Sequence, residues 1–292
     1  MTKRSIGQFH VAPIGLGAMP ASFEGVGREQ GIAMVHAALD AGITLIDTAD
    51  IYAPAWDQMG HNEKLVAEAL RTYSGDTSDV VVATKAGITR HEGEKWGRSG
   101  SADYIRGRVE ASLENLGVDR IDLHYLHRPD RSMVYAHEVE SFAVLKQEGL
   151  VAEVGISNAN VEEIEIALDV LGEGNLAAVQ NEFSPRFNHT SKAELDYCAE
   201  RGIAFLPFSP LGGTGGGAAQ VGEKYPVLAK VGDTHGITPQ RALLAWMLAL
   251  NERLIPIPGA SRPETITDSA AAMSVVLTAD EVAQISHELL AR

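Results

Sequence analysis

The sequence predicts a single domain, a (β/α)8 or TIM barrel that spans residues 1–292. Short apolar segments alternate with helical segments along the whole chain, and polar residues follow three successive apolar segments. The length of 292 residues also suits one barrel, a fold that typically has about 250 residues. No linker or run of charge divides the chain, so we expect one domain.

Patterns along the chain place the elements of this barrel in order. Residues 5–13 alternate weakly and are expected to form a hairpin that plugs the barrel floor. Barrel strands are expected at residues 14–19, at the segment that ends at Asp47, and at residues 80–85, 121–126, 151–157, 177–181, 203–207 and 254–257. Helices are expected at residues 29–40, 63–72, 101–116 and 139–148.

Four later helices are predicted from capping residues at their starts. In each case a Ser, Thr or Asn side chain can accept a hydrogen bond from the first turn, and an acid or a proline follows. The pairs are Asn160 with Glu163, Ser191 with Glu194, Thr238 with Pro239, and Thr278 with Glu281.

The segment Gly15-Leu16-Gly17 partly matches a dinucleotide-binding fingerprint. The third glycine is missing, Pro20 is expected to block an immediate helix, and no acidic residue follows at the required distance. We therefore exclude a Rossmann fold.

Composition limits the possible partners. Hydrophobic residues make up 45% of the chain and charged residues 22%, which allows a large core and excludes a disordered chain. The net charge of −15 argues against nucleic acid or an anionic membrane as a partner. An anionic cofactor would therefore need a local patch of positive charge.

The expected location is the cytoplasm. Cys198 is the only cysteine, so no internal disulfide can form, and we expect it to be a small buried residue. The N-terminal residues are basic but no apolar stretch follows them, so no secretory signal is expected. The longest apolar run, residues 242–250, is much shorter than the roughly 20 residues that cross a bilayer.

Asp47, Lys85 and His127 end three successive predicted strands, and Tyr52 lies five residues after Asp47. Because an unpaired buried charge is very costly, Asp47 is expected to pair with Lys85. Barrels of this class build active sites at the carboxyl ends of their strands. The sequence therefore predicts that these four residues form one catalytic site.

The four residues suit the reduction of a carbonyl group. A tyrosine has a pKa of about 10 and is a poor proton source at neutral pH. We expect Lys85 to lower the pKa of Tyr52 by ~2–3 units, which needs roughly 3–4 kcal/mol of differential interaction. His127 would then hydrogen-bond the substrate oxygen.

Each residue alone has a simpler interpretation. Asp47 and Lys85 could form a structural ion pair, and Tyr52 could be a packed core residue. His127 could be a hydrogen-bonded histidine without a catalytic role, and we expect this of His124, which should face the other side of its strand. No metal is expected, because the ten histidines are scattered and no zinc-binding spacing occurs.

Motifs along nearly the whole chain resemble those of the aldo-keto reductase family. They are Asp47-Thr48-Ala49-Asp50-Ile51-Tyr52, Gly60-His61-Asn62-Glu63, Thr84-Lys85, Leu126-His127-Arg128-Pro129-Asp130, Gly155-Ile156-Ser157-Asn158, Gln180-Asn181-Glu182, Ser209-Pro210-Leu211-Gly212 and Ile257-Pro258-Gly259. The resemblance implies hydride transfer from a nicotinamide dinucleotide to an aldehyde or ketone. It also implies that Tyr52 is the acid, supported by Asp47, Lys85 and His127.

The resemblance further implies a set of cofactor contacts. Ser157, Asn158 and Gln180 are expected to hold the nicotinamide carboxamide, and Phe208 to stack on its ring. Residues 209–217 are expected to cover the pyrophosphate, with a plain flexible loop as the alternative. The full expected set is Gly17, Ala18, Met19, Asp47, Ser157, Asn158, Gln180, Phe208, Ser209, Leu211, Gly213, Ser261, Arg262, Thr265 and Ser269.

The residues after the eighth predicted strand bear on the choice of dinucleotide. Members of the family often read the 2′-phosphate there with a lysine and a serine, followed by an arginine further on. This chain has Ser261 and Arg262 but no lysine, and Thr265 replaces the further arginine. We therefore expect NADPH as cofactor, with Arg262 as the main contact and some tolerance of NADH.

The expected substrate is a small carbonyl compound. Trp56 is expected to border its pocket, and Trp96 either lines the pocket or anchors a loop. Residues 207–213 are similar to those of bacterial pyridoxal reductases, so a bulky phosphate-free aldehyde is the alternative substrate. A redox-sensing module, similar to the aldo-keto-reductase-like potassium channel subunits, is a second alternative. It is less favoured because all four catalytic residues are present and no extra docking segment occurs.

Overall fold

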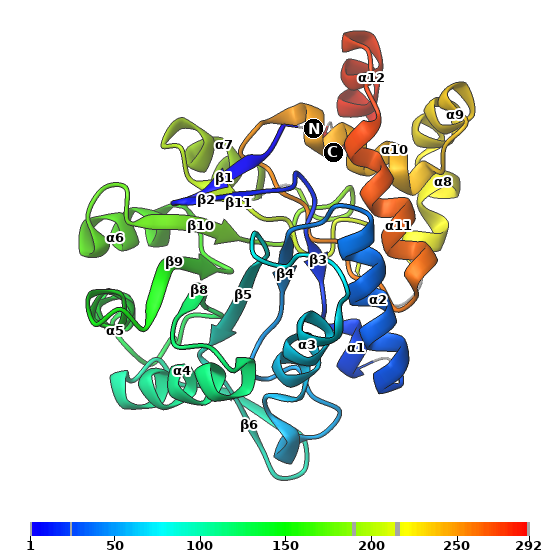
Figure 1. Cartoon of the computed structure of the whole chain (residues 1–292). Coiled ribbons are helices and arrows are strands. Elements are labelled where there is room, and N and C mark those ends of the chain that lie inside the picture. The colour runs from blue at the N-terminus through cyan, green and yellow to red at the C-terminus, as the bar shows by residue number, and fades with distance from the viewer. Residues whose placement is uncertain (1, 24, 189–190, 214–216, 291–292) are drawn as a thin grey trace.

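Seven parallel strands form most of the barrel wall in the computed structural model, which describes residues 2–23, 25–188, 191–213 and 217–290 (Figure 1). They are β3 (Leu16–Gly17), β4 (Leu45–Asp47), β5 (Val81–Ala86), β8 (Ile121–Leu126), β9 (Val151–Ser157), β10 (Leu176–Gln180) and β11 (Ala204–Phe205). Neighbours in the sheet follow chain order from β3 to β11, and all pair in parallel. This arrangement confirms the predicted (β/α)8 barrel.

Residues 254–259 close the barrel in place of a regular eighth strand. Single bridges join this segment to β11 on one side and to β3 on the other. The carbonyl oxygens of Pro256 and Pro258 accept hydrogen bonds from the N–H groups of Gly15 and Gly17 (2.9 and 3.0 Å). Proline has no N–H group, so these two residues cannot donate to the ladder. The predicted eighth strand therefore lies at the expected place but is irregular.

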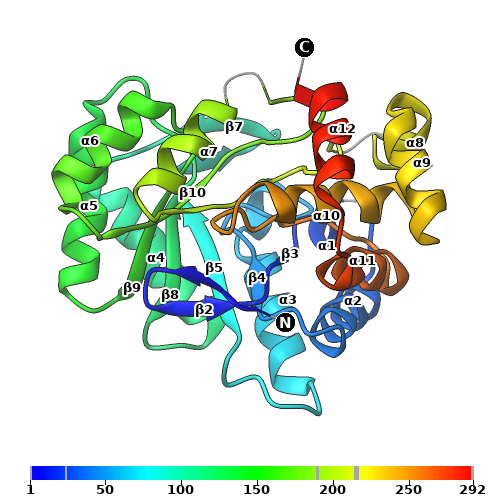
Figure 2. The same cartoon turned by 90° about the horizontal axis from the view of Figure 1, so that it is seen from above.

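The interior of the barrel is filled by every second residue of the strands. Leu45, Ala83 and Leu123 belong to one buried cluster, together with Ile6 and Val11 from the N-terminal hairpin. This hairpin consists of β1 (Arg4–Ile6) and β2 (Phe9–Val11), which pair antiparallel and lie across the barrel strands in Figure 2. The predicted plug at the barrel floor is confirmed.

Tyr125 lies inside the barrel because the neighbouring strand carries a glycine opposite it. A Cβ atom at Gly155 would lie 2.4 Å from the Tyr125 ring, a distance that no side chain tolerates. Gly155 is thus required by close packing inside the barrel.

Helices surround the wall, and most consecutive helices pack on one another. They are α1 (Pro20–Phe23), α2 (Arg28–Asp40), α3 (His61–Thr72), α4 (Ala102–Leu116), α5 (Tyr135–Gln147), α6 (Val161–Leu171), α7 (Ser191–Glu200), α8 (Val221–Lys224), α9 (Pro226–His235), α10 (Pro239–Leu250), α11 (Pro263–Ala271) and α12 (Ala279–Leu290). Short 3₁₀ helices lie at Trp56–Gln58, Ala218–Gln220 and Ala272–Ser274. None of the described helices is long and apolar enough to cross a membrane.

Three of the four predicted helix caps are confirmed. Reciprocal hydrogen bonds form the capping boxes at Asn160 and at Thr278, and the Thr238 side chain accepts from the third residue of α10. The box predicted at Ser191 is wrong, because Ser191 is already the first residue of α7 and donates to the carbonyl of Glu182.

Pro20 was expected to block a helix and instead begins α1, a helix of a single turn. Proline is tolerated at the first helical position because the N–H group of that residue has no partner within the helix.

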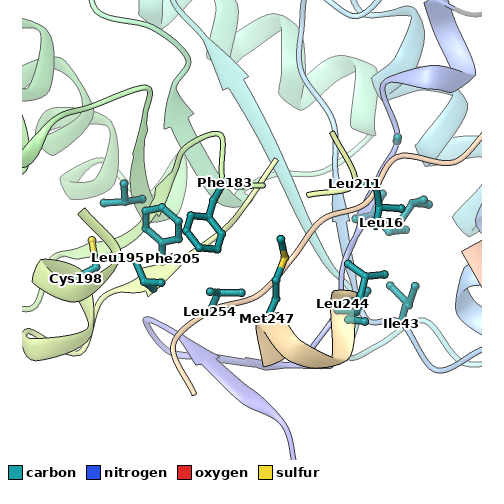
Figure 3. Packing of buried hydrophobic residues seen from close by; sticks show 14 of the residues in the cluster. Leu16, Ile43, Phe183, Leu195, Cys198, Phe205, Leu211, Leu244, Met247 and Leu254 are labelled. Carbon is teal, nitrogen blue, oxygen red and sulfur yellow. The ribbon is translucent and has the colours of Figure 1, made fainter. Parts of the chain in front are cut away.

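The main core lies between the barrel wall and the surrounding helices. Figure 3 shows Phe183 and Phe205 close to Leu195 and Cys198 of α7, all buried. Cys198 is fully buried, which raises the pKa of its thiol to about 12, so it is the small buried residue that was expected.

A second hairpin, which was not predicted, follows β5. Its strands β6 (Ile88–His91) and β7 (Lys95–Arg98) pair antiparallel. In Figure 1 the hairpin lies beyond the carboxyl ends of the barrel strands, at the opposite end from β1 and β2.

Candidate active site

Polar side chains occupy the last inward-facing positions of five neighbouring strands. They are Asp47 on β4, Lys85 on β5, His127 just after β8, Ser157 on β9 and Gln180 on β10, and none is more than 8% exposed. Each of these residues lies two positions after a residue that fills the barrel interior. Because side chains on a strand alternate between its two faces, each polar side chain points to the inside of the barrel as well. The predicted gathering of functional residues at this end of the barrel follows from that period.

Lys85 connects three groups of the site. Its Nζ atom lies 2.5 Å from Asp47 Oδ1 and 2.7 Å from the carbonyl oxygen of Thr48, and 3.4 Å from Tyr52 Oη. Burial opposes the charge of Lys85, but the neighbouring Asp47 and Tyr52 raise its pKa above the ordinary value. Gln180 donates to the second oxygen of Asp47 (2.7 Å). The predicted Asp47–Lys85 ion pair is confirmed.

The pKa of Tyr52 is raised, not lowered as the sequence suggested. Burial of the phenol raises this pKa by more than the charge of Lys85 lowers it, and Asp47 raises it further. Lys85 is also closer to Asp47 than to Tyr52 and is partly neutralised by it. Tyr52 is therefore a protonated phenol at neutral pH, which is the form that can donate a proton.

His127 lies edge-on to the ring of Tyr52, with 5.8 Å between the ring centroids. Burial and the charge of Lys85 hold the pKa of His127 well below its usual value, so its imidazole is neutral. Its Nδ1 atom has no hydrogen-bond partner among the described residues. A neutral imidazole at this position can donate one hydrogen bond to a ligand.

His124 faces the helices, as expected, but it is not hydrogen-bonded. It packs against Phe142 of α5 at 5.4 Å between centroids, and neither ring nitrogen has a partner among the described residues. Burial lowers its pKa to about 3, so His124 is a neutral core residue.

Ser157 and Asn158 form a hydrogen-bonded unit beside His127. Ser157 Oγ donates to the carbonyl oxygen of Gln180 (2.7 Å), and Asn158 Nδ2 donates to Ser157 Oγ and to the carbonyl oxygen of His127 (both 3.0 Å). Asn158 has a φ of +59°, a left-handed backbone conformation that asparagine adopts more readily than most residues other than glycine. Its Oδ1 atom accepts no hydrogen bond from the described residues, so it is free to accept one from a carboxamide.

The segment after β11 turns sharply next to Phe208. Phe208 is half-buried against the barrel interior, and one face of a ring placed there can stack on a ligand. Ser209 has a φ of +51° and its carbonyl oxygen accepts from the N–H group of Gly212 (2.9 Å). Leu211 is buried and Gly213 half-buried. Residues 214–216 of the predicted glycine-rich strap lie outside the described residues.

The residues expected to contact the 2′-phosphate of the cofactor lie just before α11 and within it. The Arg262 side chain is exposed and forms no hydrogen bond or ion pair with any described residue. Ser261 and Thr265 are half-buried on either side of it, whereas Ser269 is only 3% exposed and packs against the core. Arg262 therefore has an unengaged guanidinium that suits a phosphate. Ser269 is the least accessible of the four residues expected to contact this part of the cofactor.

The three expected contacts after β3 differ in accessibility. Gly17 and Ala18 are buried, and the N–H groups of both are bonded within the barrel wall. The carbonyl oxygen of Ala18 accepts from Asn62 Nδ2 (2.9 Å). Met19 alone of the three is half-buried.

Aromatic side chains form a wall on the outer side of Tyr52. Phe23 of α1 meets the Tyr52 ring edge-on (6.0 Å), and Trp96 of β7 stacks on Phe23 (6.4 Å). The guanidinium of Arg90 lies 4.7 Å from the Trp96 ring centroid and 5.6 Å from that of Phe23. Trp96 therefore lies at the outer end of this aromatic wall, and its role in lining a substrate pocket stays a prediction. Trp56 is 38% exposed, and its backbone N–H group donates to Glu94 between β6 and β7 (2.9 Å).

Phe23 and Arg90 were not predicted as site residues. The signal that could have indicated Arg90 is a hairpin pattern, two short segments separated by residues that include Gly93. Phe23 has no comparable local signal, because only the packing of α1 brings it to Tyr52.

A buried carboxylate network lies behind the loop that carries Tyr52. Asp50, which is fully buried, accepts from Arg108 Nε (2.7 Å), and Glu63 accepts from Thr84 and Asn115 (2.6 and 2.9 Å). Burial raises the pKa of Asp50 to about 7, although Arg108 lowers it in part. The network joins α3, α4 and β5 to the loop between Asp47 and Tyr52.

Fold and site together define a (β/α)8-barrel protein whose polar residues converge at the carboxyl ends of the strands. The chain belongs to the aldo/keto reductase family, whose model matches residues 13–288. It therefore belongs to a family of oxidoreductases.

Curated relatives match over most of their length. An uncharacterized oxidoreductase of Schizosaccharomyces pombe is 32% identical over 288 residues, covering 97% of this chain and 88% of that protein. The 6-dehydroglucose reductase of Novosphingobium aromaticivorans is 34% identical over 273 residues, covering 91% and 87%. An aldo-keto reductase of Klebsiella pneumoniae crystallised with NADPH superposes with a TM-score of 0.79 at 26% identity, covering 99% of this chain and 96% of that one.

Proposed function

We propose that this protein reduces aldehydes or ketones to alcohols with NADPH, and that Tyr52 donates the proton. The observation that carries the proposal is the hydrogen-bonded series Gln180, Asp47, Lys85 and Tyr52 at the carboxyl ends of the strands. This series ends in a protonated phenol at the mouth of the barrel, next to a neutral His127.

The side chains of the site have separate tasks in this reaction. A bound NADPH would supply the hydride. As negative charge develops on the carbonyl oxygen, the Tyr52 hydroxyl transfers its proton to that oxygen. Lys85 stabilises the phenolate that remains, and Asp47 with Gln180 holds the ammonium in place. His127 donates a hydrogen bond to the same carbonyl oxygen and so orients the substrate.

The chain offers suitable groups for a nicotinamide dinucleotide. Asn158 presents a free acceptor for the carboxamide, Phe208 presents a ring face, and Arg262 presents an unengaged guanidinium for a 2′-phosphate. Neighbours crystallised with NADPH and with NADP support this choice of cofactor. The name of one relative, 6-dehydroglucose reductase, supports a small carbonyl substrate.

Substitution of the proposed acid tests the assignment. We expect Tyr52→Phe to retain less than a few per cent of the wild-type kcat, because the hydroxyl is needed only in the transition state. NADPH affinity, measured by fluorescence quenching, should stay nearly unchanged. The measurement is NADPH oxidation with a panel of uncharged aldehydes. A Tyr52→Phe enzyme that keeps a larger share of kcat would exclude Tyr52 as the acid.

A further inference from the structure

A cavity of 540 Å³ lies between the β6–β7 hairpin and the loop after β8. Trp96 and Arg98 of β7 line one side, Arg128 and Asp130 line the other, and Asn158 borders it. The cavity adjoins the proposed site in two ways. Trp96 belongs to the aromatic wall around Tyr52, and Arg128 directly follows His127 in the chain.

Arg98 and Arg128, two of the arginines in this cavity, have almost no partners among the described residues. Arg98 forms one hydrogen bond, from Nη1 to the adjacent carbonyl oxygen of Gly97 (2.8 Å), and Arg128 forms none with the described residues. The third arginine of the cavity, Arg131, differs because it pairs with Glu163.

The charges around Arg98 and Arg128 do not balance. Each of the two lowers the pKa of the neighbouring His127, and Arg128 together with burial lowers the pKa of Arg98. Among the described carboxylates, Asp130 is the one whose charge acts on Arg98, and its oxygen Oδ1 accepts from the backbone and hydroxyl of Ser132 (3.0 and 2.7 Å). Glu138 lies behind Asp130 and accepts from its backbone N–H group, and burial raises the pKa of Glu138 to about 7, so it carries only part of a negative charge at neutral pH. Two guanidinium groups beside one partly engaged carboxylate favour an anion. In a chain with a net charge of −15, such a pair of cations is not explained by general surface charge.

We propose that Arg98 and Arg128 bind an anionic group, a carboxylate or a phosphate, carried by the substrate. The natural substrate is then an acidic aldehyde or ketone whose carbonyl group reaches Tyr52. The guanidinium fork suits both anions, because it can donate two parallel hydrogen bonds to adjacent oxygens. The inference rests on the proposed function, and it adds the substrate class.

The cofactor phosphates do not account for this pair. The segments expected to bind them follow β11 and the irregular eighth strand. Arg98 and Arg128 instead follow β5 and β8, which lie on the other side of the barrel wall. The expected nicotinamide contact Asn158 separates the two regions at the rim. The anion that these arginines bind is therefore one that the substrate brings.

Matched substrates test the proposal. One pair is 4-carboxybenzaldehyde and its neutral methyl ester, and the other is glyceraldehyde 3-phosphate and glyceraldehyde. At saturating NADPH we expect a kcat/KM about 10- to 100-fold higher for the anionic member of at least one pair, the range of one or two charge-assisted contacts. The pair that shows the preference identifies the anion as carboxylate or phosphate.

Substitutions assign the preference to the two arginines. In Arg98→Met and Arg128→Met, KM for the preferred anionic substrate should rise about tenfold or more, while the neutral substrate changes less than about twofold. Lys95→Met is the matched control, because it removes a cation from the same hairpin that does not line the cavity. It should leave both substrates unchanged.

The outcomes separate this inference from the proposed function. Equal kcat/KM within both pairs, or equal losses for anionic and neutral substrates in the arginine variants, would overturn the anion site and leave the reductase intact. If no carbonyl compound is reduced at all, the proposed function fails. Calorimetric titration with benzene-1,4-dicarboxylate and with inorganic phosphate then still decides. Weaker binding of either anion in both arginine variants supports the anion site, whereas unchanged binding of both anions, or binding of neither to the wild type, refutes it.

Discussion

Arg90 Nη1 donates a hydrogen bond of 2.8 Å to the carbonyl oxygen of Ala53, the residue that follows the proposed proton donor. The same nitrogen donates to the carbonyl oxygen of Ile51, the residue that precedes it (3.2 Å). The guanidinium also pairs with Glu94, which accepts from the backbone N–H group of Trp56 (2.9 Å). The β6–β7 hairpin thus holds the backbone on both sides of Tyr52.

This arrangement predicts a positioning role for Arg90. Arg90→Met should lower kcat by about 10- to 100-fold, because a small displacement of the acid is costly and two buried carbonyl oxygens lose their donor. NADPH binding, measured by fluorescence quenching, should change little. Glu94→Gln is the control, since it weakens only the outer contact and leaves both carbonyl bonds in place. If the two variants lose the same activity, the bonds to Ile51 and Ala53 are not what positions Tyr52.

Loss of Lys85 should affect both stability and activity. Lys85→Met leaves Asp47 without its cation in a buried site, which should cost about 3–5 kcal/mol in the free energy of unfolding. It should also abolish the reaction, because the charge that stabilises the Tyr52 phenolate is gone, and any residual rate should show an altered pH profile. The double variant Asp47→Asn with Lys85→Met should recover most of the stability but no activity. Urea unfolding measures the stability and pH–rate profiles measure the activity. A Lys85→Met protein that is as stable as wild type and keeps the wild-type pH–rate profile would contradict both expectations.

Asp50 should make stability depend on pH. Its folded-state pKa of about 7 lies above the ordinary value of 3.8, so between these values the folded protein binds a proton that the unfolded chain has released. Its contribution to stability is therefore full below about pH 4 and is lost as pH rises to about 7, by at most roughly 4 kcal/mol. Asp50→Asn removes this titration while keeping an acceptor for Arg108. The difference between the two proteins in urea unfolding should change from pH 4 to pH 7 and level off above. Parallel pH curves would show that Asp50 does not titrate in this range.

Arg262 should determine the preference for NADPH over NADH. A charge-assisted hydrogen bond is worth ~1.5–3 kcal/mol, so Arg262→Ala should weaken NADPH binding by roughly 10- to 150-fold. NADH lacks the 2′-phosphate and should bind almost as before. Fluorescence titration of both cofactors into both proteins makes the comparison. Equal losses for the two cofactors, or no loss for either, would show that Arg262 does not contact the phosphate.

The sequence by itself predicted the barrel and the pairing at its centre. Alternation with a period of two places Asp47 and Lys85 on the inner face of adjacent strands, and the cost of an unpaired buried charge joins them. Both arguments are local or pairwise. They hold wherever the chain forms these strands, and the structure confirms them.

Other features depended on the tertiary structure, because burial and contacts between distant segments do not follow from local pattern. The pKa of Tyr52 rises because the fold partly shields its phenol from water, and this effect outweighs the charge of Lys85. The spacing of residues in the sequence carries no information on that burial. The eighth strand is irregular because its two prolines face β3 in the closed barrel. Arg98 and Arg128 are 30 positions apart in the sequence, and they share one cavity only because β5 and β8 are neighbours in the sheet.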